Sequence, residues 1–450
     1  MKNMVKKTKI LLAALSALLL MTSVQSASAQ DPVAGNGFSP YSLFGFGDLL
    51  RQGTSYNLSM GGIGIGDRNV RYINLLNPAG VTAREAKSFM MDFGLENRNV
   101  LYQGNAATSL SETASGVLKS GNNTFNMHHI AVTLPIAQFG AFKLGMAPYS
   151  TVSYKFQADE SSDALIAEAG DIRYTKEGAG GIYQAFAGVG VTLWKRLSLG
   201  ADLDYYFGKI DRKSTAVFRS TASYRSLSSG WRYNVSCFSG KFGLQYEQPF
   251  SNAMSAVVGL TYSLPTRLRG GEERYAYGET SSVTDTIISR KVSLADYRMP
   301  AELGAGVSLR YGEKWMVGFD YTRADWTGID FGGYPDIDFT TGVARNFRGG
   351  FEITPNRYDV RRGHWLRRLT YRVGAYHELS HLYLNGSRIV ANGVTAGVGI
   401  PVFRYYNSIN LGVELGQRGT LQNNLVRERY FLFTLSFNLH DIWFIPTLYN

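Results

Sequence analysis

From residue 88 to residue 440 the chain repeatedly alternates apolar residues with polar or small ones. The clearest run lies at the end of this region, where every second residue is apolar: Phe431, Phe433, Leu435, Phe437 and Leu439. Side chains on a β-strand point alternately to its two faces. The pattern therefore predicts a series of strands, each with one apolar face and one polar or small-residue face.

Fourteen strands are predicted, and an even number is typical of bacterial single-chain barrels. Their ranges are 88–103, 124–138, 140–156, 180–194, 196–210, 230–247, 253–264, 286–311, 315–331, 340–354, 368–383, 387–401, 408–418 and 427–440. Twelve or sixteen strands are the alternatives. The connections alternate between short turns and long polar stretches, and membrane barrels have short periplasmic turns and long outer loops.

A soluble β-sandwich also alternates, so composition must help to separate the two classes. Charged residues make up 18% of the chain, below the ~25% that is usual in soluble domains. The mean hydropathy of −0.13 is too polar for a polytopic helical membrane protein. The sequence therefore predicts an all-β, transmembrane antiparallel barrel over residues 88–444, followed by a C-terminal tail at 445–450.

Residues 1–29 have the pattern of a cleaved signal peptide. Lys2, Lys6, Lys7 and Lys9 precede a short apolar stretch, which is followed by a small-residue cleavage site at 27–29. We expect export to the outer membrane of a Gram-negative bacterium. The net charge of +11 includes no basic run interleaved with aromatics, so nucleic acid is not an expected partner.

Residues 30–87 do not have the barrel pattern. They are rich in glycine and irregular, yet they include apolar residues such as Phe38, Phe44 and Leu49. A disordered tail would be more polar. Backbone groups in an irregular segment need polar partners, which lipid cannot provide. We therefore expect this segment to fill the lumen of the barrel as a plug.

Asn77, Pro78, Ala79 and Gly80, placed just before the first strand, resemble the plug motif of the FadL/TodX-type family. Members of that family transport long-chain fatty acids or aromatic hydrocarbons. Further stretches resemble its middle hairpin and later strands: 299–326, 368–376 and 429–439. The resemblance implies a fourteen-stranded barrel, an N-terminal hatch, and uptake of hydrophobic small molecules across the outer membrane.

Pro148 interrupts the predicted strand 140–156. Proline has no N–H to give to a ladder, so within a closed barrel it must sit at a break or a bulge. One interpretation is a bulge near the rim that only tightens curvature. The other follows from the family resemblance, which implies that the third strand kinks inward at Gly145 and Pro148 and opens a side window.

The polar faces of the predicted strands carry charges of both signs. The predicted inward-facing residues are Asp92, Glu96, Asp202, Asp204, Glu302, Arg310, Asp320, Arg348, Glu352, Arg372, Glu378 and Glu414. A network that holds barrel and plug together is the first interpretation. The second is that Arg310, Arg348 or Arg372 binds the carboxylate of a ligand.

Motifs for metal binding or catalysis are few. His377 and His381 match a zinc-protease spacing, but on a strand they would lie ~13 Å apart, too far to share a metal. The rings of the adjacent His128 and His129 are expected to face opposite sides. The lone Cys237 excludes disulfides within the chain. No catalytic set can be assembled, so we expect no enzyme activity, no metal and no cofactor.

The favoured function is an outer-membrane channel for uptake of hydrophobic small molecules, fatty-acid-like or aromatic, with a plug-gated apolar pocket and lateral exit through the wall. Its expected partners are outer-membrane lipid and the small-molecule ligand. The alternative is a non-transporting barrel subunit of an outer-membrane secretion or assembly complex, which would bind other outer-membrane or periplasmic proteins. An open porin and an outer-membrane enzyme rank below these.

Overall fold

The computed structural model describes most of the chain beyond the predicted signal peptide. The described residues are 38–85, 87–105, 117–136, 140–160, 162–219, 225–279, 284–293, 297–329, 331, 338–359, 361, 363–402 and 407–442. They belong to one compact unit that begins at Gly35. The predicted signal peptide and the tail at 445–450 lie outside the described residues and remain predictions.

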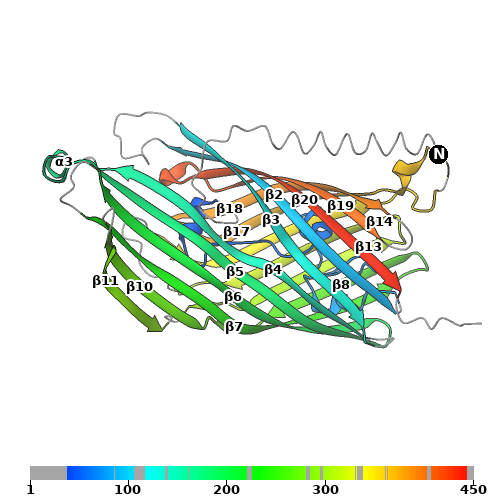
Figure 1. The fold of residues 1–450 in the computed structure, drawn as a ribbon. Coiled ribbons are helices and arrows are strands. Elements are labelled where there is room, and N and C mark those ends of the chain that lie inside the picture. The colour runs from blue at the N-terminus through cyan, green and yellow to red at the C-terminus, as the bar shows by residue number, and fades with distance from the viewer. Residues whose placement is uncertain are drawn as a thin grey trace, which may run out of the picture. The chain divides into compact units, whose positions relative to one another are not determined.

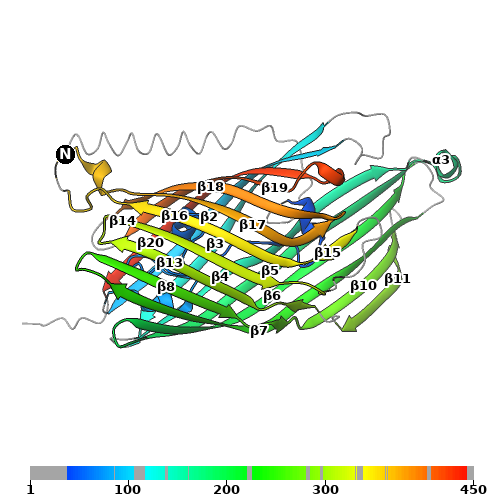
Figure 2. The same ribbon diagram turned by 180° about the vertical axis from the view of Figure 1, so that it is seen from behind.

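The fold is a closed barrel of fourteen antiparallel strands, as the alternation predicted (Figures 1 and 2). The last strand, β20, pairs with the first barrel strand, β2, from Ser88 to Gln103 and closes the barrel. The strands are β2 Ser88–Asn105, β3 Val117–Pro135, β4 Gly140–Asp159, β5 Ile172–Leu193, β6 Leu197–Phe218, β7 Ser226–Pro249, β8 Met254–Ser263, β13 Glu302–Tyr311, β14 Trp315–Asp325, β16 Val343–Ile353, β17 Thr370–Leu384, β18 Ser387–Pro401, β19 Ser408–Arg418 and β20 Arg427–Ile442.

The predicted single strand 286–311 is wrong. It consists of β11 (Thr284–Ser293) and β13, with the two-residue β12 (Arg298–Met299) and Pro300 between them. Proline cannot donate to a ladder, so Pro300 ends the pairing that precedes β13. β11 instead forms a hairpin with β10 (Gly270–Glu279), and β10 pairs with the first half of β7.

Strands β5, β6 and β7 are longer than predicted. Polar residues occur on both faces of their outer halves, so the period-two signal fades while the backbone ladder continues. Three short strands complete the sheets: β1 Asp48–Leu49 on β4, β15 Phe339–Thr341 on β17, and β9 Thr266–Arg267 on β12.

The helices within the described residues are short. They are η1 Pro40–Leu43, α2 Ser55–Leu58, η2 Pro78–Thr82, α3 Asp163–Ala169, η4 Trp365–Arg368 and η5 Gln422–Asn424. Among the described residues, no helix has the length and apolar character needed to cross a membrane.

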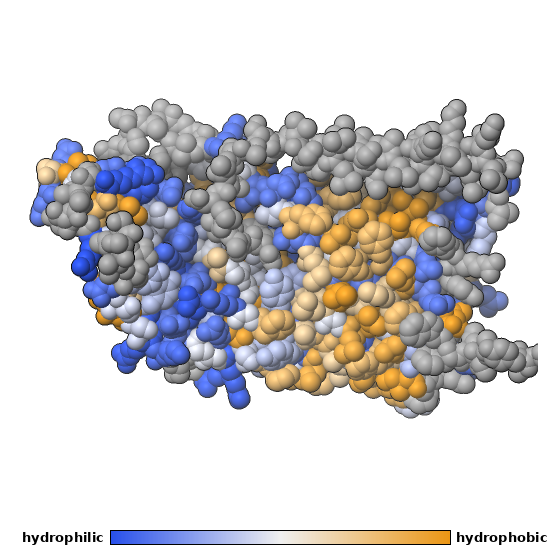
Figure 3. All heavy atoms as spheres, in the orientation of Figure 1, coloured by the Kyte–Doolittle hydropathy of each residue, from blue (hydrophilic) through white to orange (hydrophobic). Residues whose placement is uncertain are grey.

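The two faces of the wall are as the sequence predicted. All twelve predicted inward-facing charged residues are buried or half-buried. Large apolar side chains are exposed on the outside, among them Leu203, Phe238, Val258, Leu303 and Leu415. They gather over the part of the wall nearer the short connections, whereas the end with β10 and β11 is hydrophilic (Figure 3). This distribution fits a lipid-facing belt.

Residues 38–85 lie among the inward faces of the strands. Most of them are buried, and their backbone finds partners on the wall. The carboxylate of Asp320 accepts hydrogen bonds from the amides of Gly64 and Ile65, at 2.7 and 2.8 Å. The amide of Gly61 donates to Thr395 on β18. The backbone polar groups of an irregular buried segment are thereby paired.

Candidate functional site

Asn77 and Pro78 start the short helix η2. The Asn77 side chain accepts from the amide of Ala79 at 3.0 Å and donates to the carbonyls of Ile65 and Leu244. Pro78 occupies the first helical position, where its missing N–H costs nothing. Asn77 therefore connects the end of the N-terminal segment to Ile65 earlier in the same segment and to Leu244 on β7.

This turn rests on glycines of the barrel wall. An added Cβ on Gly200 or Gly243 would lie within 3.0 Å of Pro78 or Asn77, and one on Gly259 would overlap Ile65. The glycines therefore make a shallow track that admits the N-terminal backbone. This role does not follow from the sequence pattern, although the small residues on the inward face are visible in the alternation.

Replacing Gly243 with alanine is expected to unseat the 77–80 turn, because the new methyl group overlaps Asn77 Oδ1. Overpacking of this kind costs about 1–3 kcal/mol. The midpoint of heat-induced unfolding, followed by the gel shift of the folded barrel, should fall, and residues 38–85 should become more sensitive to protease. Gly349→Ala is the matched control, since nothing lies within 4 Å of its added Cβ. Equal midpoints for the two variants would contradict the track.

Ion pairs connect residues 48–51 of the N-terminal segment to the barrel wall. Arg51 pairs with Glu414 on β19, and Asp48 pairs with Arg418 on the same strand. Arg418 also contacts Glu428 on β20 at 2.7 Å. These groups are largely buried, so the pairs are screened little by water. They form a latch that holds residues 48–51 against β19.

The three arginines predicted as ligand contacts have different environments. Arg372 is 1% exposed, and its nitrogens donate to Glu352, Asn410 and Tyr72. Arg310 donates to Asp67 of the N-terminal segment at 2.8 Å. The donors of these two arginines are used within the protein. Arg348 pairs with Glu378 at 2.9 Å and lies on the wall of the main cavity.

The main cavity occupies about 260 Å³ of the lumen. One part of its wall is apolar and aromatic: Leu49, Tyr149, Tyr206, Leu264, Met299 and Trp326. Another part is charged: Asp48, Arg51, Asp204, Lys241, Glu302, Asp320, Arg348, Glu378 and Arg418. The lining is thus mixed rather than apolar throughout, and it suits a molecule with both an apolar body and a polar group.

The wall has a break between β3 and β4. Their ladder runs from Pro135–Ala141 to Ile130–Met146 and stops there. Beyond that point, within the part of the chain that the structure describes, β3 pairs with β2 alone and β4 pairs with β5. The β4–β5 register shifts between Pro148 and Ser150, a bulge at the proline. Residues Gly145 and Pro148 therefore flank the point where the two strands part.

The N-terminal segment covers the free edge of β4. Asp48 and Leu49 pair with Thr151 and Ser150, and the amide of Leu50 donates to the carbonyl of Tyr149 at 2.9 Å. An open edge exposes backbone groups that need partners, and β1 supplies them. The β1–β4 pairing spans two residues of each strand.

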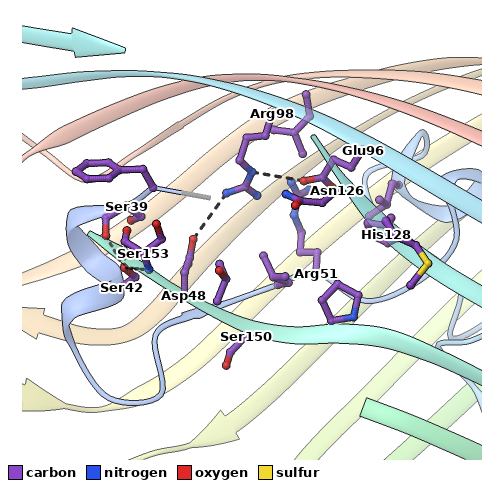
Figure 4. A pocket seen from close by; sticks show the side chains of 17 residues that line it. Ser39, Ser42, Asp48, Arg51, Glu96, Arg98, Asn126, His128, Ser150 and Ser153 are labelled. Carbon is purple, nitrogen blue, oxygen red and sulfur yellow. Dashed lines mark hydrogen bonds and ion pairs between the residues drawn. The ribbon is translucent and has the colours of Figure 1, made fainter. Parts of the chain in front are cut away.

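A second, smaller cavity of about 40 Å³ lies in this break (Figure 4). Its wall includes His128 on β3 and Pro148 on β4. Arg98 of β2 points between Asp48 and Glu96, at 3.7 and 3.6 Å (Figure 4). Three residues of the N-terminal segment line both this cavity and the main one: Asp48, Leu50 and Arg51. The segment 48–51 is therefore the partition between the lumen and the break in the wall.

The prediction that His128 and His129 face opposite sides is wrong. The register shifts between Gly94 and Leu95, so His128 is the extra residue of a bulge and both rings are buried. His129 Nε2 lies 2.5 Å from Asp92 Oδ1, and the Nδ1 atoms of the two rings are 3.0 Å apart.

The zinc-protease spacing lies on β17, as the strand interpretation predicted. His377 is exposed on the outside of the barrel, whereas His381 is buried and lines the main cavity. The two rings therefore cannot share a metal. Within the described residues, no group of three or more His, Cys, Asp or Glu side chains could hold a metal ion.

The fold and its lumen define the class: a transmembrane β-barrel of fourteen strands with an N-terminal segment buried among the inward faces. The sequence profile of the BamG family matches residues 4–450, and the chain belongs to that family. No curated protein matches the chain.

Solved structures of similar fold are hydrocarbon channels and a FadL homologue. The Pseudomonas putida toluene transporter TodX has 14% identity and a TM-score of 0.55, covering 88% of this chain and 100% of that one. The Ralstonia pickettii toluene transporter TbuX has 13% identity and a TM-score of 0.54, covering 86% and 98%. A Pseudomonas aeruginosa FadL homologue has 10% identity and a TM-score of 0.51, covering 87% and 99%. At these identities the comparison establishes the fold.

Proposed function

We propose that this protein is an outer-membrane channel for small molecules with a hydrophobic body, and that its N-terminal segment is a plug that gates the path. The observation that carries the proposal is the break between β3 and β4, which lies next to the lumen cavity behind a partition of a few residues. Cargo would enter the main cavity and leave sideways into the membrane. The transporters of similar fold support this proposal by analogy.

The mixed lining refines the expected cargo. An aliphatic or aromatic body would lie against Leu49, Tyr206 and Trp326, and a polar or carboxylate group would face Arg348. Arg348 already has Glu378 as its partner, so a ligand carboxylate would have to compete with that ion pair. The proposed cargo is therefore amphiphilic or neutral with one polar group.

Replacing Pro148 with valine is expected to slow uptake. Valine restores a backbone donor and favours an extended strand, which extends pairing at the break. One additional ladder hydrogen bond would stabilise the form in which the gap between β3 and β4 is closed by about 1 kcal/mol. The population of the form with an open gap would fall roughly fivefold. Uptake of a labelled apolar probe into proteoliposomes is the measurement. Pro135→Val, within the intact part of the β3–β4 ladder, is the control. Unchanged uptake in Pro148→Val would count against the side path.

A second candidate is a non-transporting barrel subunit of an outer-membrane assembly or secretion complex. It is favoured by the β10–β11 hairpin, because β11 pairs with β10 on one side and exposes Ile287 and Ile288. Exposed apolar edge strands are common sites for pairing with another protein. Purifying the native complex with and without residues 270–293 separates the candidates. Stoichiometric partners that depend on the hairpin would favour the subunit.

A further inference from the structure

The connection between β16 and β17, residues 354–369, differs from the other connections at its end of the barrel. Its neighbours are tight turns, such as 194–196 between β5 and β6 and 312–314 between β13 and β14. This one is long, ends in η4, and stands out sideways from the barrel end as the yellow-orange turn near β14 (Figures 1 and 2). By the usual orientation of such barrels, this end faces the periplasm.

The helix η4 is attached to the lipid-facing side of the wall. The hydroxyl of Tyr371 donates to the carbonyl of Leu366 at 3.0 Å. Tyr371 is outward-facing, because its neighbours Thr370 and Arg372 are buried toward the lumen and its partner across the ladder is the exposed Ile353. This bond places η4 where the apolar belt meets the short connections.

Two large apolar side chains of η4 are exposed. Trp365 is 45% and Leu366 is 52% exposed, although burying apolar surface is favourable. They continue the outward apolar surface formed by Ile353 and Tyr371. Tryptophan is enriched where a membrane meets water, because its ring is both apolar and a hydrogen-bond donor.

The same connection is strongly basic. Residues 354–369 contain five arginines and one acid, Asp359. The bidentate contact of Arg361 with Asp359, at 2.9 and 2.6 Å, holds the pKa of that carboxyl well below its usual range. Arg367 lies 3.9 Å from the same carboxylate, and Arg368 is exposed. Glu313 of the neighbouring turn lies 3.6 Å from Arg357. The five arginines thus face two carboxylates, and the surface keeps an excess of positive charge.

We propose that this connection is a binding site for an anionic phospholipid of the inner leaflet. The phosphate would lie against Arg361, Arg367 and Arg368, because guanidinium groups match phosphate oxygens. Trp365 and Leu366 would enter the boundary between headgroups and acyl chains. An acidic protein surface would match the charge as well, but it would not account for apolar side chains continuous with the lipid-facing wall.

The test uses the full-length protein in micelles that contain phosphatidylglycerol and phosphatidylcholine. Native mass spectrometry reports which lipid stays bound. Wild type should retain phosphatidylglycerol selectively, and the double variant Arg361→Gln/Arg367→Gln should lose about tenfold in occupancy. The matched control is Arg173→Gln/Arg274→Gln, two arginines outside this connection that also contact one carboxylate each.

Lipid contact is tested separately from charge. A lipid with brominated acyl chains should quench part of the tryptophan emission of wild type, and Trp365→Phe should remove that part. If the arginine pair prevents folding, Arg367→Gln alone tests the same contact. The proposal is overturned if wild type binds both lipids equally, if the control pair loses as much occupancy, or if an acidic protein occupies the site instead.

Discussion

Replacing Arg372 with methionine is expected to destabilise the barrel by about 3–5 kcal/mol, the usual cost of removing one partner from a buried ion pair. The side chain donates to Glu352, Asn410 and Tyr72, and its guanidinium group stacks on the rings of Tyr56 and Tyr72. Methionine fills much of the volume but leaves the buried Glu352 with Arg310, 3.5 Å away, as its remaining ion-pair partner. It also removes a contact between the wall and the N-terminal segment.

Denaturant titration of the refolded barrel, followed by the gel shift, measures this loss. The variant Arg372→Met/Glu352→Leu should recover part of it, since replacing both charges by apolar groups avoids the buried carboxylate. Arg225→Met is the control: it breaks the contact with Asp285, where both side chains are mostly exposed, and should cost under about 1 kcal/mol. A similar effect for Arg372 and Arg225 would show that the Arg372 cluster is not structural.

Alternation predicted the barrel well because it is a local signal. In a strand such as β20, which has lipid on one side and the lumen on the other, apolar and polar residues alternate along the sequence. The signal fails where the environment no longer alternates. The outer halves of β5–β7 are therefore extended beyond the predicted ranges, and β10 lies where a loop was expected.

Bulges are the second limit. A single extra residue moves every following side chain to the other face, and nothing in the Met127–His129 stretch distinguishes a bulge from a regular strand. The alternating pattern therefore could not predict that both histidine rings are buried inside the wall. The bulge at Pro148 was predictable, because a proline has no backbone N–H to donate and its presence is visible in the sequence.

The site was only partly predictable, because its contacts join distant parts of the chain. The inward direction of Arg348 follows from the strand period, but its pairing with Glu378 depends on the register of β16 and β17. The pocket expected to be apolar has a charged part, formed by inward-facing charges of the barrel strands such as Asp204 and Arg348, and residues 48–51 add Asp48 and Arg51 to it. No local pattern shows that these two residues meet β19.

Locking the N-terminal segment to β4 is expected to abolish passage through the wall. Leu49 and Ser150 are direct partners across the β1–β4 pair, and opposed residues of antiparallel strands are about 4.5–5.5 Å apart between Cα atoms, within reach of a disulfide. The variant Leu49→Cys/Ser150→Cys, with Cys237→Ser to remove the native thiol, should block uptake when oxidised. Reduction should restore it, because the partition at 48–51 can then leave the break.

The lock distinguishes movement of the segment from a fixed pore. If cargo passes through the two cavities without any rearrangement, the oxidised protein keeps its uptake rate, and gating by the N-terminal segment is excluded. A disulfide elsewhere in the wall controls for the chemistry: Val258→Cys/Val307→Cys joins direct partners on β8 and β13, where the ladder is unbroken. That variant should transport equally well in both redox states, because no partition moves between those strands. Loss of uptake in both oxidised variants would mean that the wall as a whole must flex, and residues 48–51 would then have no special role in the path.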